Sequence, residues 1–137
     1  MRRRVRVSRG RIRRYVARAL NDLPPKFREA AENVMVVVES QPRPDDEQSK
    51  RGRGADGVGR SAVRRHPDEP LMGIYRGVPL SERAGYQLVT PDVIAIFRKP
   101  LLRVCRTRRQ VEAEARLTVL HEFGHFLGLT EEQVAHL

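Results

Sequence analysis

Two histidines four residues apart, with a glutamate directly after the first, form the segment best suited to chemistry. The segment His121–His125 reads His-Glu-Phe-Gly-His. On a helix, residues four apart lie on the same face, so both imidazoles can bind one metal ion. Glu122 lies one step round the helix, where its carboxylate can reach a metal-bound water. Two nitrogen ligands, an open coordination position and a carboxylate base are typical of zinc-dependent hydrolases.

The alternative interpretation is a pair of ordinary core histidines. Burying two neutral imidazoles and a carboxylate in an apolar wall costs several kcal/mol unless polar partners satisfy them. A metal ion would satisfy all three groups, which favours the metal site. The apolar wall is formed by Leu117, Val119, Leu120, Phe123, Phe126 and Leu127.

A single long helix must position these residues, and its ends can be read from the sequence. Thr107 and Gln110 fit a capping box, in which a hydroxyl at the N-cap and an amide three residues later satisfy the first backbone N–H groups. Gly128 is the expected end of the helix, because glycine can turn the chain in the left-handed region. Gly124, between the two histidines, is small enough to let another backbone element come close.

The third metal ligand is expected just beyond this helix, and three residues are candidates: Glu131, Glu132 and His136. Glu131 lies ten residues after His121, where the extended metalloprotease pattern has a histidine. A carboxylate at that position is also a zinc ligand. Both glutamates also fit the acidic first turn of a short last helix capped by Thr130.

Several sequence blocks, quoted at the end of this paragraph, resemble the minimal-zincin metallopeptidase family of small bacterial proteins. The resemblance covers about residues 15–135, with the blocks in the right order. The position corresponding to Glu131 is usually Asp in that family. The Arg-rich start and the basic stretch before Pro70 depart from the family pattern. The blocks are Ala19–Pro24, Glu32–Glu39, Gly73–Leu80, Pro91–Arg98 and Val119–Leu129.

This resemblance implies a zincin-like α+β fold and a zinc metallopeptidase activity. In the mechanism we expect, His121, His125 and Glu131 bind one Zn²⁺ and Glu122 is the general base that activates water for hydrolysis of a peptide or protein substrate. The sequence does not choose a second oxyanion donor among three further candidates. These are His66, Tyr75 and Tyr86.

Two other classes of protein remain open. One is a non-catalytic zinc-binding zincin-like module. The other is a basic RNA- or ribosome-associated protein in which the zinc site is structural.

Three strand signals define the rest of the expected domain, at residues 34–38, 71–75 and 93–97. Together they predict an α+β unit, which the resemblance implies is zincin-like: an N-terminal helix, a small three- to four-stranded mixed sheet and the C-terminal zinc helix. We expect residues 93–97 to be the edge strand that lines the substrate cleft. Residues 1–10 are predicted to be a basic flexible tail and 11–137 a single domain, with a disordered insertion at about 41–69.

Composition limits the remaining possibilities. The chain has 137 residues, enough for one domain with a modest core. Its single cysteine, Cys105, excludes an internal disulfide and is expected to be a small core residue. The sequence shows neither a membrane span nor the apolar segment of a secretory signal, so we expect a cytoplasmic protein.

The net charge of +10 is concentrated at the N-terminus, where residues 1–18 hold nine arginines and no acid. We expect these arginines to form the solvated face of a helix packed on the core. The alternative is an anionic partner, such as RNA, acidic lipid or an acidic protein. With no recognisable nucleic-acid motif, we expect at most non-specific polyanion binding. The apolar stripe that would face the core consists of Ile12, Tyr15, Val16, Ala19 and Leu20.

Overall fold

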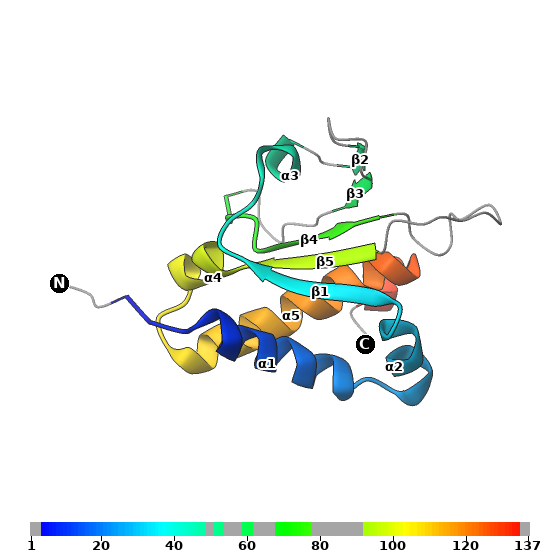
Figure 1. Ribbon diagram of the computed structural model, residues 1–137, viewed down its shortest axis with the longest axis horizontal. Helices are drawn as coiled ribbons and strands as arrows, with labels where there is room; N and C mark the ends of the chain where they lie inside the picture. The colour runs from blue at the N-terminus through cyan, green and yellow to red at the C-terminus, as the bar shows by residue number, and fades with distance from the viewer. Residues whose placement is uncertain (1–3, 49–50, 54–58, 62–67, 78–91, 135–137) are drawn as a thin grey trace.

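A mixed sheet packs against two long helices, α1 and α5, and shorter helices flank it (Figure 1). The computed structural model describes residues 4–48, 51–53, 59–61, 68–77 and 92–134. The helices are α1 (Arg9–Asn21), α2 (Pro25–Ala31), α3 (Pro44–Gln48), α4 (Arg98–Val104), α5 (Arg108–Leu127) and α6 (Glu131–Val134). The strands are β1 (Val34–Glu39), β2 (Arg51–Arg53), β3 (Gly59–Ser61), β4 (Gly73–Arg76) and β5 (Asp92–Phe97).

The strand order in the sheet is β1-β5-β4-β3-β2. β1 pairs with β5 in parallel, with Val34 opposite Asp92, whereas β4 pairs with β5 in the antiparallel direction. These three strands confirm the expected α+β architecture with a small mixed sheet. The strands β3 and β2 extend the sheet to five, and they were not predicted from the sequence. Together with α3, they lie in residues 41–69, where a disordered insertion is predicted.

The expectation that residues 93–97 form the edge strand is wrong. β5 is paired on both sides, with β1 over its whole length and with β4 from Val93 to Ile96. The continuous apolar run of β5 is typical of a central strand buried on both faces. It does not indicate a strand that lines a cleft. The neighbour of β5 that contacts the last turns of α5 is β4, through Tyr75 and Phe126.

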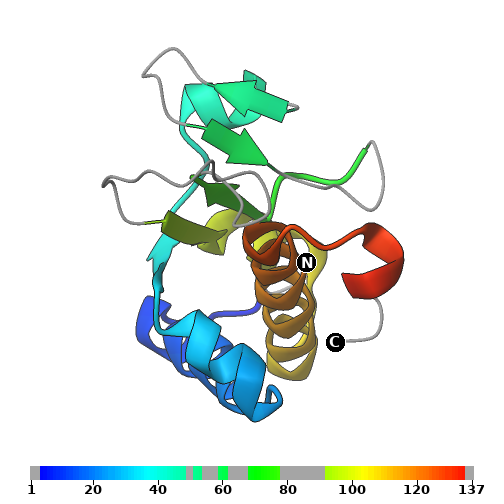
Figure 2. The same cartoon turned by 90° about the vertical axis from the view of Figure 1, so that its right-hand side faces the viewer.

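Helices α1 and α5 cover one face of the sheet and run parallel to each other (Figure 2). The predicted apolar stripe of α1 is buried at Ile12, Tyr15, Val16 and Ala19. Two surface ion pairs, Arg18 with Glu112 and Asp22 with Arg116, lie four residues apart on each helix and show the parallel alignment. On the other face of the sheet, a smaller apolar cluster includes Ile74 and Phe97.

The described part of residues 1–10, predicted to be a flexible tail, is built into the fold from Val7 onward. Val7 is 2% exposed and belongs to the main core. Its carbonyl accepts a hydrogen bond of 2.8 Å from Arg98 Nε. The Ser8 hydroxyl then caps α1 by accepting a hydrogen bond from Arg11 N.

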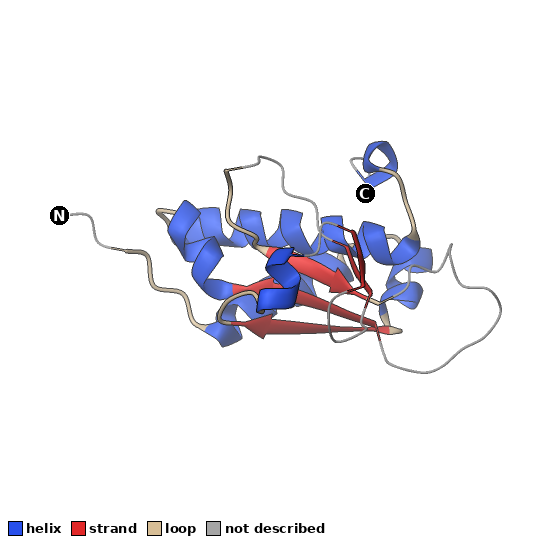
Figure 3. Cartoon of the chain, turned by 90° about the horizontal axis from the view of Figure 1, so that it is seen from above, coloured by secondary structure: helices blue, strands red, loops and turns tan. Residues whose placement is uncertain are grey.

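Helix α3 lies on the side of the sheet opposite α1 and α5 (Figures 1 and 3) and is held there by a buried ion pair. Arg76 of β4 donates through Nε and Nη2 to both oxygens of Asp46, at 3.1 and 2.7 Å. It also binds both oxygens of Glu39, at 3.1 and 2.9 Å. These hydrogen bonds hold the pKa of Glu39 below its ordinary value, although burial acts in the opposite direction. The network ties α3, β1 and β4 together at one point.

We predict that Arg76→Ala lowers the free energy of unfolding by about 3–5 kcal/mol, because it leaves buried carboxylates with their main counter-charge removed. The Asp46 side chain is 0% exposed and that of Arg76 is 6% exposed, so solvent cannot replace the lost interaction. Arg43→Ala is the matched control, since Arg43 also binds Glu39 but is 56% exposed. Urea unfolding measures both. Equal losses for the two variants would contradict the assignment.

Candidate metal centre

The helix α5 that carries His121–His125 has the ends that the sequence predicts. Thr107 Oγ1 accepts a hydrogen bond of 3.1 Å from Gln110 N, and Gln110 Oε1 accepts one of 3.3 Å from Thr107 N. Gly128 ends the helix in the left-handed region, at φ 77°. The histidines therefore lie in the last two turns of a capped, 20-residue helix.

The positions around α5 explain what each residue of the motif faces. Each residue of a helix is rotated by about 100° from the one before it, so His121 and His125 lie about 40° apart. Glu122 is then on one side of the histidine pair, and Gly124 is on the other side. The two sides of α5 contact different elements, β4 and α6, and Figure 2 shows α6 beside the end of α5.

The Glu122 side of α5 packs against β4. Thr118, one turn before Glu122, lies so close to Gly73 that a Cβ on this glycine would overlap its methyl group. Phe126, one turn after Glu122, contacts the Tyr75 ring edge-on, with 6.0 Å between ring centroids. Residues four apart share a helix face, so Glu122 faces β4 between these two contacts. Glu122 is accordingly 1% exposed.

The Gly124 side of α5 packs against α6. A Cβ on Gly124 would overlap the side chain of Val134, so the glycine is needed for α6 to lie this close. The turn that leads there is also fixed, because Leu129 N donates to Gly124 O at 2.9 Å. Thr130 and Gln133 form a second capping box at the start of α6. The expectation that Gly124 allows a close approach is thereby confirmed.

The histidines themselves lie between β4 and α6. Their ring centroids are 5.8 Å apart and their planes are inclined by 51°. The Nε2 atoms of both rings and Oε1 of Glu122 are buried from solvent. Imidazole nitrogens and carboxylate oxygens are the donor types that zinc takes, so the types of these buried atoms fit a zinc ion with two histidine ligands.

The candidates for a third ligand are placed differently. Glu131 is the first residue of α6, and its side chain is outside the part of the chain that the structure describes. Glu132 is exposed, and His136 lies outside the described residues. Among the described side chains, no three His, Cys, Asp or Glu residues are grouped closely enough to hold a metal ion.

Of the candidate oxyanion donors, Tyr75 is the one that the structure describes; His66 and Tyr86 lie outside the described residues. Tyr75 is fully buried on β4 and reaches the metal-site helix through Phe126. The Tyr75 hydroxyl and the Asp92 carboxylate both lie close to Gly77, at the position that a Cβ on this glycine would take. Gly73, which lets α5 pack closely on β4, was not predicted from the sequence. A glycine inside a strand often marks a close approach of another element, and this was the signal that could have identified it.

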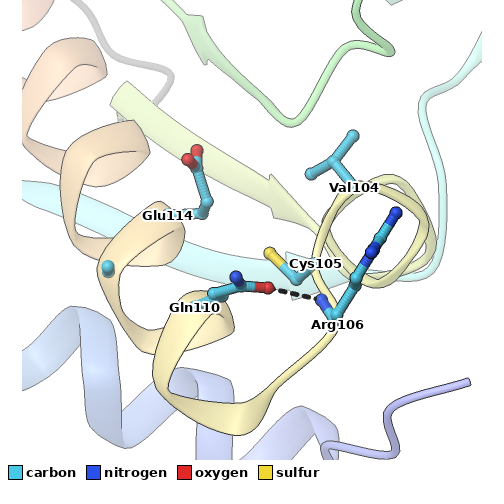
Figure 4. A pocket seen from close by; sticks show the side chains of 6 residues that line it. Val104, Cys105, Arg106, Gln110 and Glu114 are labelled. Atoms are coloured by element: carbon cyan, nitrogen blue, oxygen red, sulfur yellow. Dashed lines mark hydrogen bonds between the residues drawn. The ribbon is translucent and has the colours of Figure 1, made fainter.

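A pocket of about 270 Å³ lies near the opposite end of α5 (Figure 4). Cys105 lines it but is 5% exposed, which confirms the expectation of a core cysteine. Arg106, Gln110 and Glu114 form its polar wall. Gln110 precedes His121 by 11 residues, or about 16 Å along a helix, so this pocket is separate from the histidine site.

Residues 31–137 match the profile of the family described as zincin-like metallopeptidase. Since the match covers most of the chain, the protein belongs to the zincin-like metallopeptidase family. The predicted resemblance is confirmed, with four of the five sequence blocks inside the match; the block Ala19–Pro24 precedes it. No curated protein matches the chain. Within the described ranges, none of the helices combines the length and apolar character needed to cross a membrane.

We predict that Gly124→Ala destabilises the protein, although alanine is the better helix former by about 1 kcal/mol. The added methyl group must displace Val134, and such overpacking costs about 1–3 kcal/mol. In a Val134→Ala background the same change should become neutral or stabilising. Thermal unfolding of the four proteins measures the coupling.

Gly10→Ala is the control for helix propensity, because nothing lies within 4 Å of its Cβ position. It should stabilise the protein by up to about 1 kcal/mol. If Gly124→Ala is equally stabilising with Val134 in place, α6 does not pack on α5 as described.

Proposed function

We propose that the protein is a zinc-dependent peptidase in which His121, His125 and Glu131 hold the metal and Glu122 is the general base. The observation that carries this proposal is the placement of both histidines between β4 and α6, with Glu122 buried beside them. Family membership supports peptidase chemistry. The close packing of Val134 on Gly124 supports the choice of α6 as the source of the third ligand.

Within α6, the periodicity of the helix favours residue 131 over residue 132. Val134 contacts α5, and residues three apart share a helix face, so position 131 is on the side of α6 that contains Val134. Position 132 is turned away from that side, in agreement with the exposure of Glu132. A carboxylate from α6 would complete a set of two nitrogen ligands and one oxygen ligand, which zinc accepts.

A zinc ion held by His121, His125 and Glu131 would supply a Lewis acid for the scissile carbonyl and lower the pKa of the attacking water. Glu122 would accept a proton from the attacking water and return it to the leaving amine. Its burial against β4 keeps bulk water away from the carboxylate and fixes its orientation. The apolar neighbours Phe123 and Phe126 make the surroundings low in polarity, which strengthens each charge interaction in the site.

The substrate in this proposal is an extended peptide that pairs with β4. Strand β4 lies against the part of α5 that carries Glu122, through the contacts of Gly73 with Thr118 and of Tyr75 with Phe126. An extended peptide can add to a sheet through main-chain hydrogen bonds.

The second candidate function is a zincin-like module that binds zinc and does not catalyse. One observation favours it: both histidine Nε2 atoms and Glu122 Oε1 are buried, as in a closed, structural zinc site. In that case Glu122 would be a structural partner of the site and its replacement would alter stability rather than turnover.

We predict that Glu122→Gln retains one zinc ion per chain and lowers peptide cleavage by about 10²–10⁴-fold, because the amide cannot accept the proton. His121→Ala and His125→Ala should lose both the metal and the activity. Metal analysis of the purified proteins and cleavage of an unbiased peptide library measure these outcomes. Wild-type protein that carries zinc but cleaves no peptide would instead establish the non-catalytic module.

We predict that Glu131→Ala weakens zinc binding by more than about 100-fold, since loss of even an outer partner of a ligand costs 10–100-fold. Glu132→Ala is a matched control that removes the same charge from the neighbouring residue of α6. Competition with a zinc chelator measures both affinities. Should Glu132→Ala have the larger effect, the ligand assignment in α6 is wrong.

A further inference from the structure

We propose that one end of the molecule binds the phosphate backbone of double-helical nucleic acid. This surface, the basic end, consists of the exposed arginines of residues 4–14 and of residues 103–109. Residues 4–14 hold six arginines and residues 103–109 hold four; neither segment contains an acid. The first segment stands out in the sequence, whereas the second joins it only in the fold.

The fold brings these two segments together although they are far apart in the sequence. Arg98 Nε donates to Val7 O at 2.8 Å, which joins the start of α4 to the residues before α1. The parallel packing of α1 and α5 places the first turns of both helices at the same end of the molecule (Figure 1). The basic end is therefore one continuous region of the fold.

The electrostatics of the basic end are unfavourable for the isolated protein. Both helices begin with exposed arginines and have no acid in the first turn, although a helix N-terminus is itself positive. Arg9 and Arg13 are both exposed and are spaced i,i+4, an arrangement that destabilises a helix when the charges are alike. A bound polyanion would relieve this repulsion.

The positive charge is separated from the candidate metal centre along α5. Residues 110–134 hold five acids and one arginine, the opposite balance to residues 98–109. His121 follows Arg108 by 13 residues, or about 20 Å along the helix. The basic end is thus a second surface, distinct from the peptide site.

The side chains at the basic end favour a nucleic-acid duplex over other anionic partners. Arginine guanidinium groups match phosphate oxygens in a bidentate geometry. A membrane-binding helix needs a free apolar face, whereas the apolar stripe of α1 is buried in the core. Val104 is the one large apolar side chain exposed there among those described. Single-strand binding uses exposed aromatic side chains, and the described residues include none.

The test is the salt dependence of binding to a fluorescent duplex of about 30 base pairs, from about 50 to 300 mM salt, by fluorescence anisotropy. Full-length wild type is compared with Arg13→Gln/Arg108→Gln, which removes one charge from each segment. The loss of two phosphate contacts should make the negative slope of log K against log salt less steep by about 1.8. The affinity at 0.1 M salt should fall by about 60-fold. The matched control is Lys26→Gln/Arg28→Gln on α2, which should bind within about twofold of wild type.

Three results would overturn the proposal. The first is an equal loss for the α2 control, which would show a response to net charge alone. The second is unchanged duplex binding by Arg13→Gln/Arg108→Gln. The third is binding of wild type to vesicles rich in anionic lipid that is tighter than its duplex binding. If the first double variant fails to fold, Arg9→Gln/Arg106→Gln provides the same comparison at other exposed positions.

Discussion

The packing of α5 on three sides is the constraint on which the rest of the structure depends. Helix α1 and the strands β4 and β5 cover its apolar face, and α6 crosses its last turns. At two of these contacts a glycine allows an approach that a side chain would prevent: Gly73 of β4 against Thr118, and Gly124 against Val134. Gly124 lies within the motif and Gly73 contacts α5 three residues before His121, so the two contacts determine which elements flank His121 and His125.

Strand β4 connects this site to the other face of the sheet. Its Tyr75 faces α5, while the next residue, Arg76, binds Asp46 and Glu39 on the α3 side. Strand β4 is thus held by ring packing on one face and by a buried ion pair on the other. A peptide that pairs with β4 would meet a strand whose position is fixed before it binds, which lowers the free-energy cost of ordering the site.

Much of this site could be predicted because its signals are local. The capping box at Thr107, the left-handed turn at Gly128 and the small residue at Gly124 can each be recognised from residues close to them in the sequence. The central position of β5 and the pairing of Arg76 with Asp46 could not be predicted, since both depend on contacts between segments remote in the sequence. The basic end could not be predicted for the same reason, since its two halves are brought together by the parallel packing of α1 and α5 and by the hydrogen bond from Arg98 to Val7.

The division of the chain between two surfaces follows from the same packing. The first turns of α1 and α5 carry positive charge, and the last two turns of α5 carry both histidines and Glu122. The family match begins at residue 31, so α1 lies outside the matched region. It nevertheless packs on α5, the helix that carries the histidines. Its arginines add a charged surface without altering the residues around the candidate metal centre.

X-ray absorption spectroscopy of the zinc-loaded protein at the zinc edge tests the central claim most directly. The proposed centre predicts two imidazole nitrogens and oxygen ligands at about 2.0–2.2 Å, with no sulfur. The zinc signal should be absent in His121→Ala, which is expected to lose the metal. A sulfur ligand from Cys105, or a wild-type spectrum with fewer than two imidazoles, would contradict the account.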